Sequence, residues 1–178
     1  SHTYAIYLLP DLIIALKAAF PHLAITVKMM NSLSVVDALS RHEIDFGFIE
    51  KPLSMKQMHR IPLVKDQLVL VGDPEVGPWL VREETSGVSY YTQRYIAEYD
   101  IKQEQLAIHN NDMIVALLKK GYGCSIISER AAKDLPYQKL SSKYQRYFYL
   151  ITRVQEPRVE LMPVIAWLEK TAASTSHQ

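Results

Sequence analysis

The chain has 178 residues, of which 48% are apolar and 22% are charged, values typical of a globular protein that buries its core without disulfides. Twenty basic and nineteen acidic residues give a formal net charge of +1 without a basic cluster, which argues against direct nucleic-acid binding by these residues. One cysteine, Cys124, excludes an internal disulfide and fits a reducing compartment, and no apolar run reaches the roughly 20 residues of a membrane-spanning helix.

The first predicted helix opens at Pro10 and Asp11 and ends before Pro21. Its apolar stripe is wider than one core-facing side requires, which indicates either thorough burial or a partner surface. The sequence before this helix contains no strand, initiating Met or signal peptide. We therefore expect a fragment of a longer protein, in which the origin of Ser1 and His2 stays open.

Residues 23–50 organise the first half of the chain. The β-branched, apolar run Leu23–Met30 predicts a buried strand, Asn31 and Ser32 are suited to cap a helix, and Ile44–Ile49 predicts a second strand. Such a unit has parallel strands joined by a right-handed crossover. Ligands of open parallel sheets bind at the carboxyl ends of strands, against helix N-termini. Asn31 and Ser32 are therefore expected at a binding site.

Turn-forming residues mark the middle of the chain. A polar loop is expected over Lys51–Arg60, and the strand that follows it ends at Gly72. The sequence DPEVGP at residues 73–78 has the densest turn chemistry and predicts a hinge between two lobes. A new strand is expected from Trp79.

A helix over residues 90–99 follows the polar loop Glu83–Ser89. Its tyrosines Tyr91, Tyr95 and Tyr99 fall on one face at spacings of four residues. Such a stripe is most often packing, and ligand stacking and a subunit contact are the alternatives.

A second strand–helix–strand unit repeats the first at an offset of 78 residues, which pairs Ser32 with Asn110. Leu106–His109 predicts a strand, Asn110 and the residues beside it cap a helix that Gly121 ends, and Cys124–Ile127 predicts the next strand. Two similar α/β lobes, each with a polar pair at a helix start, are the simplest explanation. Within its strand, Cys124 is expected to be a buried small residue rather than a reactive thiol.

The end of the chain predicts a return to the first lobe. Tyr147–Thr152 predicts a long strand that recrosses the hinge, and Glu160–Lys170 predicts a closing helix that Pro163 starts or kinks. The expected organisation is a first lobe of residues 1–73 and 150–178, a second lobe of residues 77–146, and crossovers near residues 73–77 and 146–150.

Catalytic and metal-binding motifs are missing from the sequence. The histidines have no ligand spacing, one cysteine cannot complete a zinc site, and neither a GxSxG elbow nor a P-loop is present. No enzyme, metal or cofactor is therefore expected.

A set of polar residues remains at predicted strand ends and helix starts: Thr3, Asn31, Ser32, Ser86, Ser89, His109, Asn110 and Asn111. Helix starts favour anions, so these residues predict a small ligand that carries a carboxylate, phosphate or sulfate. The alternative for each is a structural role such as a helix cap, and the prediction rests on recurrence in two lobes.

These residues also carry a family resemblance. The sequences SHTYAIYLLPDLIIALKAAFP, MMNSLSVVDAL and EIDFGFIE resemble the start of the effector-binding domain of LysR-type transcriptional regulators. Later segments resemble that domain in the same order: DQLVLVG, WLVREETSGVSYYTQRYI, LAIHNNDMIVALLKKGYGCSIIS, RYFYLIT and VIAWLEK. The similarity spans essentially all 178 residues and looks nearest to regulators of carbon fixation and sulfur assimilation.

The resemblance implies an α/β fold of two Rossmann-like lobes, like that of type II periplasmic binding proteins, joined by two crossover strands. It implies a small-molecule effector in the cleft, bound by residues 1–3, Asn31–Ser32, Ser86–Ser89 and His109–Asn111, and a homodimer or higher homo-oligomer. It also implies that DNA is contacted only by a helix-turn-helix module outside this chain, and that the first strand of lobe I is missing.

The second-lobe loop departs from the family pattern. It usually reads close to GSGTR, whereas this sequence has TSGVS with Ser89 in place of the arginine. The missing arginine weakens the expectation that a strongly anionic ligand is clamped there.

Three functions are compatible with the sequence. The favoured one is a ligand-sensing, dimerising domain of a cytoplasmic transcription factor with no membrane contact. A solute-binding receptor of a transport system would share the fold, and a signal peptide or lipobox in the full gene would identify it. An enzyme on the same lobes would need a titratable pair in the cleft, and the sequence offers none.

Overall fold

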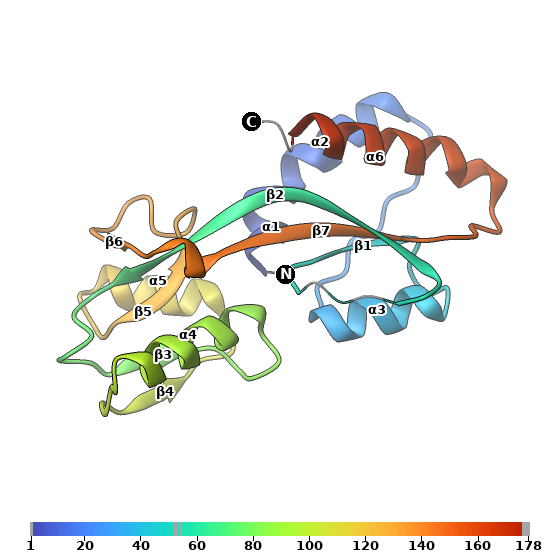
Figure 1. Ribbon diagram of the computed structural model, residues 1–178. Coiled ribbons are helices and arrows are strands. Elements are labelled where there is room, and N and C mark those ends of the chain that lie inside the picture. The colour runs from blue at the N-terminus through green and yellow to red at the C-terminus, as the bar shows by residue number, and fades with distance from the viewer. Residues whose placement is uncertain (1, 52, 54, 176–178) are drawn as a thin grey trace. The chain divides into compact units, whose positions relative to one another are not determined.

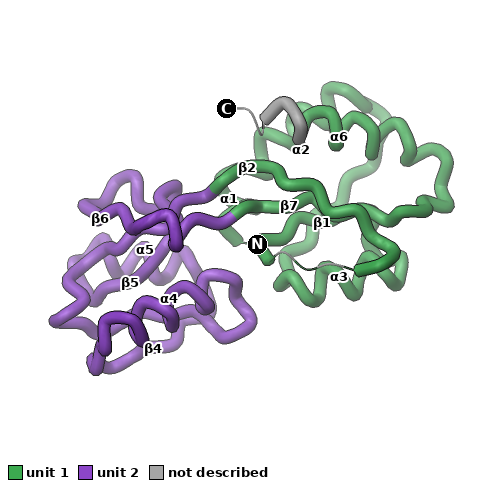
Figure 2. Tube along the Cα trace, in the orientation of Figure 1, with its two compact units in different colours: residues 1–65, 147–178 green, residues 66–146 purple. Residues whose placement is uncertain are grey.

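The computed structural model describes residues 2–51, 53 and 55–175, with side chains described up to residue 171. The chain divides into unit 1, residues 1–65 and 147–178, and unit 2, residues 66–146 (Figure 2). Strands β2 (Met58–Val71) and β7 (Gln145–Arg153) contribute residues to both units. The first passage between units therefore lies inside the 14-residue strand β2, upstream of the turn at residues 73–77 that the sequence indicates.

Unit 1 packs helices on both faces of a short antiparallel pair of strands. Strand β1 (Phe46–Ile49) pairs with β7, with Phe46 opposite Thr152. The helices are α1 (His2–Tyr7), α2 (Leu9–Ala19), α3 (Ser32–Ser40) and α6 (Met162–Thr175), and a 3-10 turn, η2 (Val159–Leu161), precedes α6. Helices α2 and α6 lie side by side (Figure 1), and Leu16 packs with Leu168 there.

Alternation along β1 separates two hydrophobic clusters. Phe48 faces the helices α1, α2 and α6, and its ring stacks on that of Tyr4 at a centroid distance of 4.6 Å. Ile49 faces α3 and packs with Leu39. Gly47 permits the close approach of α3, because a Cβ atom there would lie 2.3 Å from a methyl carbon of Val35.

The predicted strand Leu23–Met30 is wrong. These residues are in neither helix nor strand, and among the described residues no backbone hydrogen bond involves residues 24–30. A β-branched apolar run favours extended backbone, but it becomes a strand only where another strand pairs with it. The predicted strand–helix–strand unit therefore contains only its second strand, β1, whose observed partner β7 is antiparallel.

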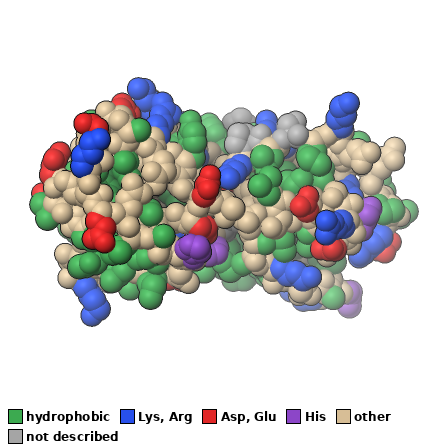
Figure 3. Space-filling model, turned by 90° about the horizontal axis from the view of Figure 1, so that it is seen from below, with side chains coloured by type: hydrophobic (Ala, Val, Ile, Leu, Met, Phe, Trp, Pro, Cys, Tyr) green, Lys and Arg blue, Asp and Glu red, His purple; other side chains and the backbone are tan. Residues whose placement is uncertain are grey.

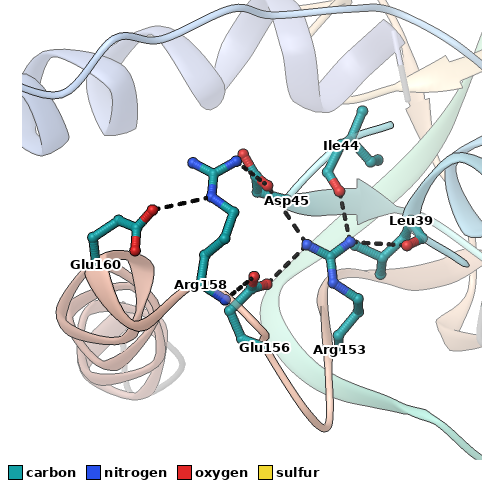
Figure 4. Close-up of polar contacts among 7 residues, drawn as sticks. All are labelled: Leu39, Ile44, Asp45, Arg153, Glu156, Arg158 and Glu160. Carbon is teal, nitrogen blue, oxygen red and sulfur yellow. Dashed lines mark hydrogen bonds and ion pairs between the residues drawn. The ribbon is translucent and has the colours of Figure 1, made fainter. Parts of the chain in front are cut away.

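A network around Arg153 joins the end of α3, the start of β1 and the loop after β7 (Figure 4). The Arg153 Nη1 atom donates to the carbonyl oxygens of Leu39 at 2.8 Å and Ile44 at 2.7 Å, and Nη2 pairs with Glu156 Oε2 at 2.8 Å. The Arg153 side chain is 8% exposed and that of Glu156 is 4% exposed. This buried guanidinium fixes a loop that the sequence did not single out.

Unit 2 is built around a parallel pair of short strands. Strand β3 (Trp79–Val81) pairs parallel with β4 (Gln105–Ala107), and Trp79 also forms a parallel bridge to Cys124. The helices are α4 (Gly87–Glu98) and α5 (Asn111–Lys119). The remaining elements are β5 (Ser125–Ser128), β6 (Gln138–Lys139) and a 3-10 turn, η1 (Ser142–Tyr144); β5 and β6 pair antiparallel with β2.

The core of unit 2 accounts for the tyrosine stripe. Tyr95 lies in one cluster with Trp79, Tyr144 and Cys124, and Tyr91 packs against that cluster. The Tyr99 ring packs against that of Tyr95 at a centroid distance of 4.4 Å, tilted by 33°, but Tyr99 stays 58% exposed. Packing is therefore the main role of the stripe. Burial raises the pKa of the Cys124 thiol to about 12, so the thiol stays protonated at neutral pH.

The predicted helix caps and the position of Pro163 agree with the structure, whereas one predicted loop does not. Asn31 and Asn110 are N-caps, and Gly121, at φ +74°, follows the end of α5 as predicted. Pro163 lies in the first turn of α6. The expected loop Lys51–Arg60 is too long, because β2 already begins at Met58. Among the helices of the described residues, none has the length and hydropathy needed to cross a bilayer.

Candidate functional site

The starts of two helices lie at one edge of the parallel pair in unit 2. Val81 at the end of β3 is opposite Ala107 at the end of β4, and Ile108 N–H donates to the Val81 carbonyl at 2.8 Å. The chain passes from β3 to the start of α4 and from β4 to the start of α5. Because the strands are parallel, both helix starts meet at their carboxyl edge.

The polar residues at this edge differ in burial. Ser86 and Ser89 are 8% and 6% exposed and Asn111 is 9% exposed, whereas His109 and Asn110 are exposed. Asn110 caps α5, since its Oδ1 atom accepts from Met113 N–H at 2.9 Å. Ser86 is the N-cap residue of α4, but its side chain makes no capping hydrogen bond. Unit 2 thus has buried hydroxyl and amide groups beside two helix N-termini.

Ser32 has an unusual environment at the start of α3 in unit 1. The neighbouring Asn31 caps this helix, with its Oδ1 atom accepting from Ser34 N–H at 2.9 Å. Ser32 is 1% exposed, and its buried Oγ atom has no hydrogen-bond partner within the described part of the chain. A buried hydroxyl without a partner costs about 1–3 kcal/mol. The capping alternative therefore accounts for Asn31 but leaves Ser32 unexplained.

Thr3 is the second residue of α1 and is 7% exposed. The segment expected as an effector loop at residues 1–3 is thus helical from His2, and Ser1 lies outside the described residues. No local signal in the sequence identified this helix.

Arg82 and Glu83 form an ion pair just before α4. The guanidinium of Arg82 binds both carboxylate oxygens of Glu83, at 3.0 and 2.7 Å. This hydrogen bonding lowers the pKa of Glu83; burial partly offsets the effect, and the positive charge of Arg82 adds to it. Because Arg82 is occupied by Glu83, it does not replace the arginine that the sequence lacks at Ser89. The polar side chains buried at this edge, those of Ser86, Ser89 and Asn111, are uncharged.

The lowered pKa of Glu83 predicts a pH dependence. Unfolding returns the carboxyl to its ordinary pKa of 4.5, so the ion pair stabilises the fold above pH 4.5 and the effect is lost as the pH falls through the folded pKa. We expect Glu83→Gln to lower the melting temperature slightly at pH 7, with the difference from wild type shrinking under acid conditions. Calorimetry from pH 7 to 3 measures this; a difference that grows on acidification would contradict it.

Thr152 is a buried polar residue that no sequence pattern singles out. It lies in β7 opposite Phe46, is 1% exposed, and its Oγ1 atom has no hydrogen-bond partner among the described residues. The sequence predicts the strand, but a threonine in a strand carries no signal that its hydroxyl is unpaired.

The side chains of the described residues also bear on metal binding and on nucleic-acid binding. No group of three or more His, Cys, Asp or Glu side chains among them could hold a metal ion. Lys and Arg side chains are mixed with Asp and Glu over the face seen in Figure 3, without an extended basic surface.

Comparison with protein families gives a match to the family described as LysR substrate binding domain over residues 1–172. An uncharacterised HTH-type transcriptional regulator in the lacR 5′ region of Staphylococcus xylosus is 25% identical over 158 residues, covering 85% of this chain and 58% of that protein. The uncharacterised HTH-type regulator YeiE of Escherichia coli (strain K12) is 27% identical over 152 residues, covering 75% and 51%. The chain spans about half the length of these relatives.

Solved structures share the fold. The regulatory domain of Synechocystis PCC6803 CcmR in complex with 2-PG has a TM-score of 0.78 at 17% identity, covering 98% of this chain and 95% of that one. The effector binding domain of QuiR in complex with shikimate has a TM-score of 0.77 at 17% identity, covering 98% and 94%. The predicted α/β fold of the type II periplasmic-binding-protein kind is confirmed.

Proposed function

Because the chain belongs to the LysR substrate-binding-domain family, we propose that it is the effector-sensing and dimerisation domain of a LysR-type DNA-binding transcriptional regulator. Its ligand is a small metabolite bound at polar helix starts, for which the candidate residues are Thr3, Ser32, Ser86, Ser89 and the segment His109–Asn111. Binding shifts the population of domain or dimer conformations, which an attached DNA-binding module reads out. The proposal includes no catalytic step and no cofactor.

The unpaired Ser32 hydroxyl is the observation that carries this proposal. It is buried at the N-terminus of a nine-residue helix, where backbone N–H groups and the helix dipole favour an acceptor oxygen. An oxygen of the ligand would accept the hydrogen bond that Ser32 lacks. The occupied Arg82 leaves recognition to hydroxyls, amides and backbone groups, which suits a carboxylate or phosphate with further hydroxyl groups. The solved complexes of relatives with 2-PG and shikimate support a small polar ligand of this kind.

Ser32→Ala tests the site. A thermal-shift screen with phosphate, sulfate and small hydroxy acids identifies a ligand for the wild type, because a ligand at a hundred times its Kd stabilises the native state by about 2.7 kcal/mol. We expect Ser32→Ala to weaken binding by roughly 10- to 150-fold, since hydrogen bonds to charged groups contribute about 1.5–3 kcal/mol. Without ligand, the variant should be at least as stable as wild type, because an unpaired hydroxyl is removed.

Ser40→Ala is the matched control. Ser40 ends the same helix, is exposed, and donates to the Asp37 carbonyl at 2.8 Å. The Ser40→Ala variant should bind the ligand with the same affinity as wild type. Equal affinities for Ser32→Ala and wild type would remove Ser32 from the site.

We further propose that the domain forms a homodimer or higher homo-oligomer in the cytoplasm and that DNA is contacted through a helix-turn-helix module outside these residues. Exposed apolar side chains on two helices support a subunit contact: Ile14 on α2 is 69% exposed, and Tyr90 on α4 is 64% exposed. Light scattering during gel filtration measures the oligomeric state. A strictly monomeric profile at high protein concentration would contradict this part of the proposal.

A further inference from the structure

Two neighbouring strands, β2 and β7, carry the chain between the units. Unit 2 begins at Asp66 in β2 and ends at Arg146 in β7, as the change of colour in Figure 2 shows. These two residues are also bonded to each other, because Asp66 Oδ2 pairs with Arg146 Nε at 2.9 Å. The first and the last residue of unit 2 therefore form an ion pair, which joins both passages of the chain at the boundary itself.

The ion pair is deeply buried and belongs to a larger network. The side chain of Asp66 is 0% exposed and that of Arg146 is 4% exposed. The other carboxylate oxygen, Asp66 Oδ1, accepts from the Ser128 hydroxyl at 2.6 Å. Ser128 lies in β5, which pairs with β2 inside unit 2. We call Asp66, Ser128 and Arg146 the boundary clamp. Both passages of the chain are thus fixed to one internal strand of unit 2.

A second polar link lies one residue further into unit 2. Gln145 Nε2 donates to Gln67 Oε1 at 3.0 Å. Gln67 Nε2 also donates to the Leu140 carbonyl at 3.1 Å, and the Gln67 carbonyl accepts from Glu129 N–H at 2.8 Å. Strands β2 and β7 therefore enter unit 2 with two consecutive side-chain links between them, and both links are tied to other segments of that unit.

The unit 1 side of the boundary has exposed residues instead. Lys65 and Tyr147 come directly next to the boundary clamp; both are exposed, Tyr147 by 42%. The Lys65 ammonium lies 5.9 Å from the centre of the Tyr147 ring, which is a weak cation–π contact at an exposed site. Leu63 and Phe148, slightly further along the two strands, are buried in the core of unit 1. Lys65 and Tyr147 thus lie between buried anchors on either side.

Stability alone does not explain why the clamp is charged. A buried ion pair is often no more stabilising than apolar residues of similar volume, because both charged groups lose their hydration. Apolar groups, however, tolerate several packing arrangements, whereas a satisfied network of directional hydrogen bonds specifies one. The boundary clamp therefore restricts the direction in which both strands leave unit 2.

We propose that the boundary clamp is a conformational device, which fixes β2 and β7 where they leave unit 2 and thereby confines movement between the units to Lys65 and Tyr147. Hinges consist of a few residues that absorb changes in φ and ψ. With the clamp in place, each strand has one such position, between the clamp and the core of unit 1. The inference goes beyond the proposed function and depends neither on the identity of the ligand nor on its binding.

Distances between two spin labels, measured by pulsed electron paramagnetic resonance on the 178-residue chain, test the clamp. The labels are attached at exposed helix positions, Asp37→Cys in unit 1 and Ala116→Cys in unit 2. Cys124 should stay unlabelled, because it is buried and its raised pKa keeps the thiol protonated. We expect Asp66→Leu with Arg146→Met to make the distribution of distances at least about 1.5-fold wider than in wild type.

Two further variants separate the clamp from general destabilisation. Ile96→Ala shortens a side chain in the core of unit 2 without touching the clamp, so it should keep the width of wild type. Ser128→Ala removes one hydrogen bond of the clamp and retains both charges, so it should widen the distribution by a smaller amount. A wild-type width in both clamp variants, or the same widening by Ile96→Ala, would overturn the proposal.

A pair of glycine substitutions locates the movement. Lys65→Gly with Tyr147→Gly increases backbone freedom at the proposed hinge and leaves the clamp intact, so the distribution should widen. Arg60→Gly with Tyr149→Gly is the matched control. The Arg60 guanidinium lies 5.0 Å from the centre of the Tyr149 ring, a contact of the same kind in the same two strands but within unit 1. This control should keep the width of wild type, and equal effects of the two glycine pairs would contradict a hinge at Lys65 and Tyr147.

Discussion

Arg153→Ala is expected to lower the free energy of unfolding by about 3–5 kcal/mol, the usual loss when one partner of a buried ion pair is removed. The substitution leaves the carboxylate of Glu156, 4% exposed, without its guanidinium. It also removes the donor that the Leu39 and Ile44 carbonyls share (Figure 4). The Arg153 guanidinium holds the end of α3 against the segment that leads into β1. Losing it should therefore loosen α3, the helix whose N-terminus contains Ser32. Urea denaturation with an unchanged m-value measures the effect.

Arg158→Ala is the matched comparison within the same network. The Arg158 side chain is 53% exposed, and its guanidinium lies 3.4 Å from Asp45 and 3.5 Å from Glu160. Exposed ion pairs contribute about 0–1 kcal/mol, so this variant should unfold close to the wild-type midpoint. If Arg153→Ala and Arg158→Ala lowered the free energy of unfolding by similar amounts, burial would not determine how much each arginine contributes to stability.

Asp66→Ala is expected to destabilise the protein by a similar amount, about 3–5 kcal/mol. Asp66 is fully buried; its Oδ2 atom binds Arg146 Nε at 2.9 Å, and its Oδ1 atom accepts from the Ser128 hydroxyl at 2.6 Å. These bonds tie β2, β5 and β7 together in unit 2. Removing the carboxylate leaves the Arg146 side chain, 4% exposed, without this partner.

A double-mutant cycle separates two quantities: the contribution of the Asp66–Arg146 pair to stability, and the destabilisation caused when one charge loses this partner. Replacing both residues, as Asp66→Leu with Arg146→Met, should recover much of the loss, because apolar groups of similar size often replace a buried ion pair without penalty. Urea unfolding of the single and double variants gives the coupling energy. A double variant as unstable as the sum of the single variants would contradict the explanation by an unpaired buried charge.

Features that depend on a few neighbouring residues could be predicted from the sequence. Asn31 and Asn110 cap α3 and α5 as expected, because each side chain accepts from the N–H group three residues ahead. Gly121 follows α5 because it adopts a positive φ, at which other residues are strained. The order of helices and strands also sufficed for the fold class.

Strand partners could not be predicted in this way. Leu23–Met30 has the composition of a strand, yet composition does not show whether another strand lies beside it, and none does among the described residues. The same holds for the start of β2. The strand begins at Met58, within residues whose composition is that of a polar loop, because pairing and not composition defines a strand.

The sequence by itself determined the N-caps of α3 and α5, the end of α5, the two-lobed α/β class and the polar residues that make a binding site worth testing. Only the tertiary structure decided which of those residues lack a partner, as at Ser32, and which distant residues pair, as Asp66 with Arg146 across 80 positions and Arg153 with Leu39 across 114. The reason is physical: a helix cap is satisfied within one turn, whereas burial and ion pairing join side chains that the chain brings together only on folding.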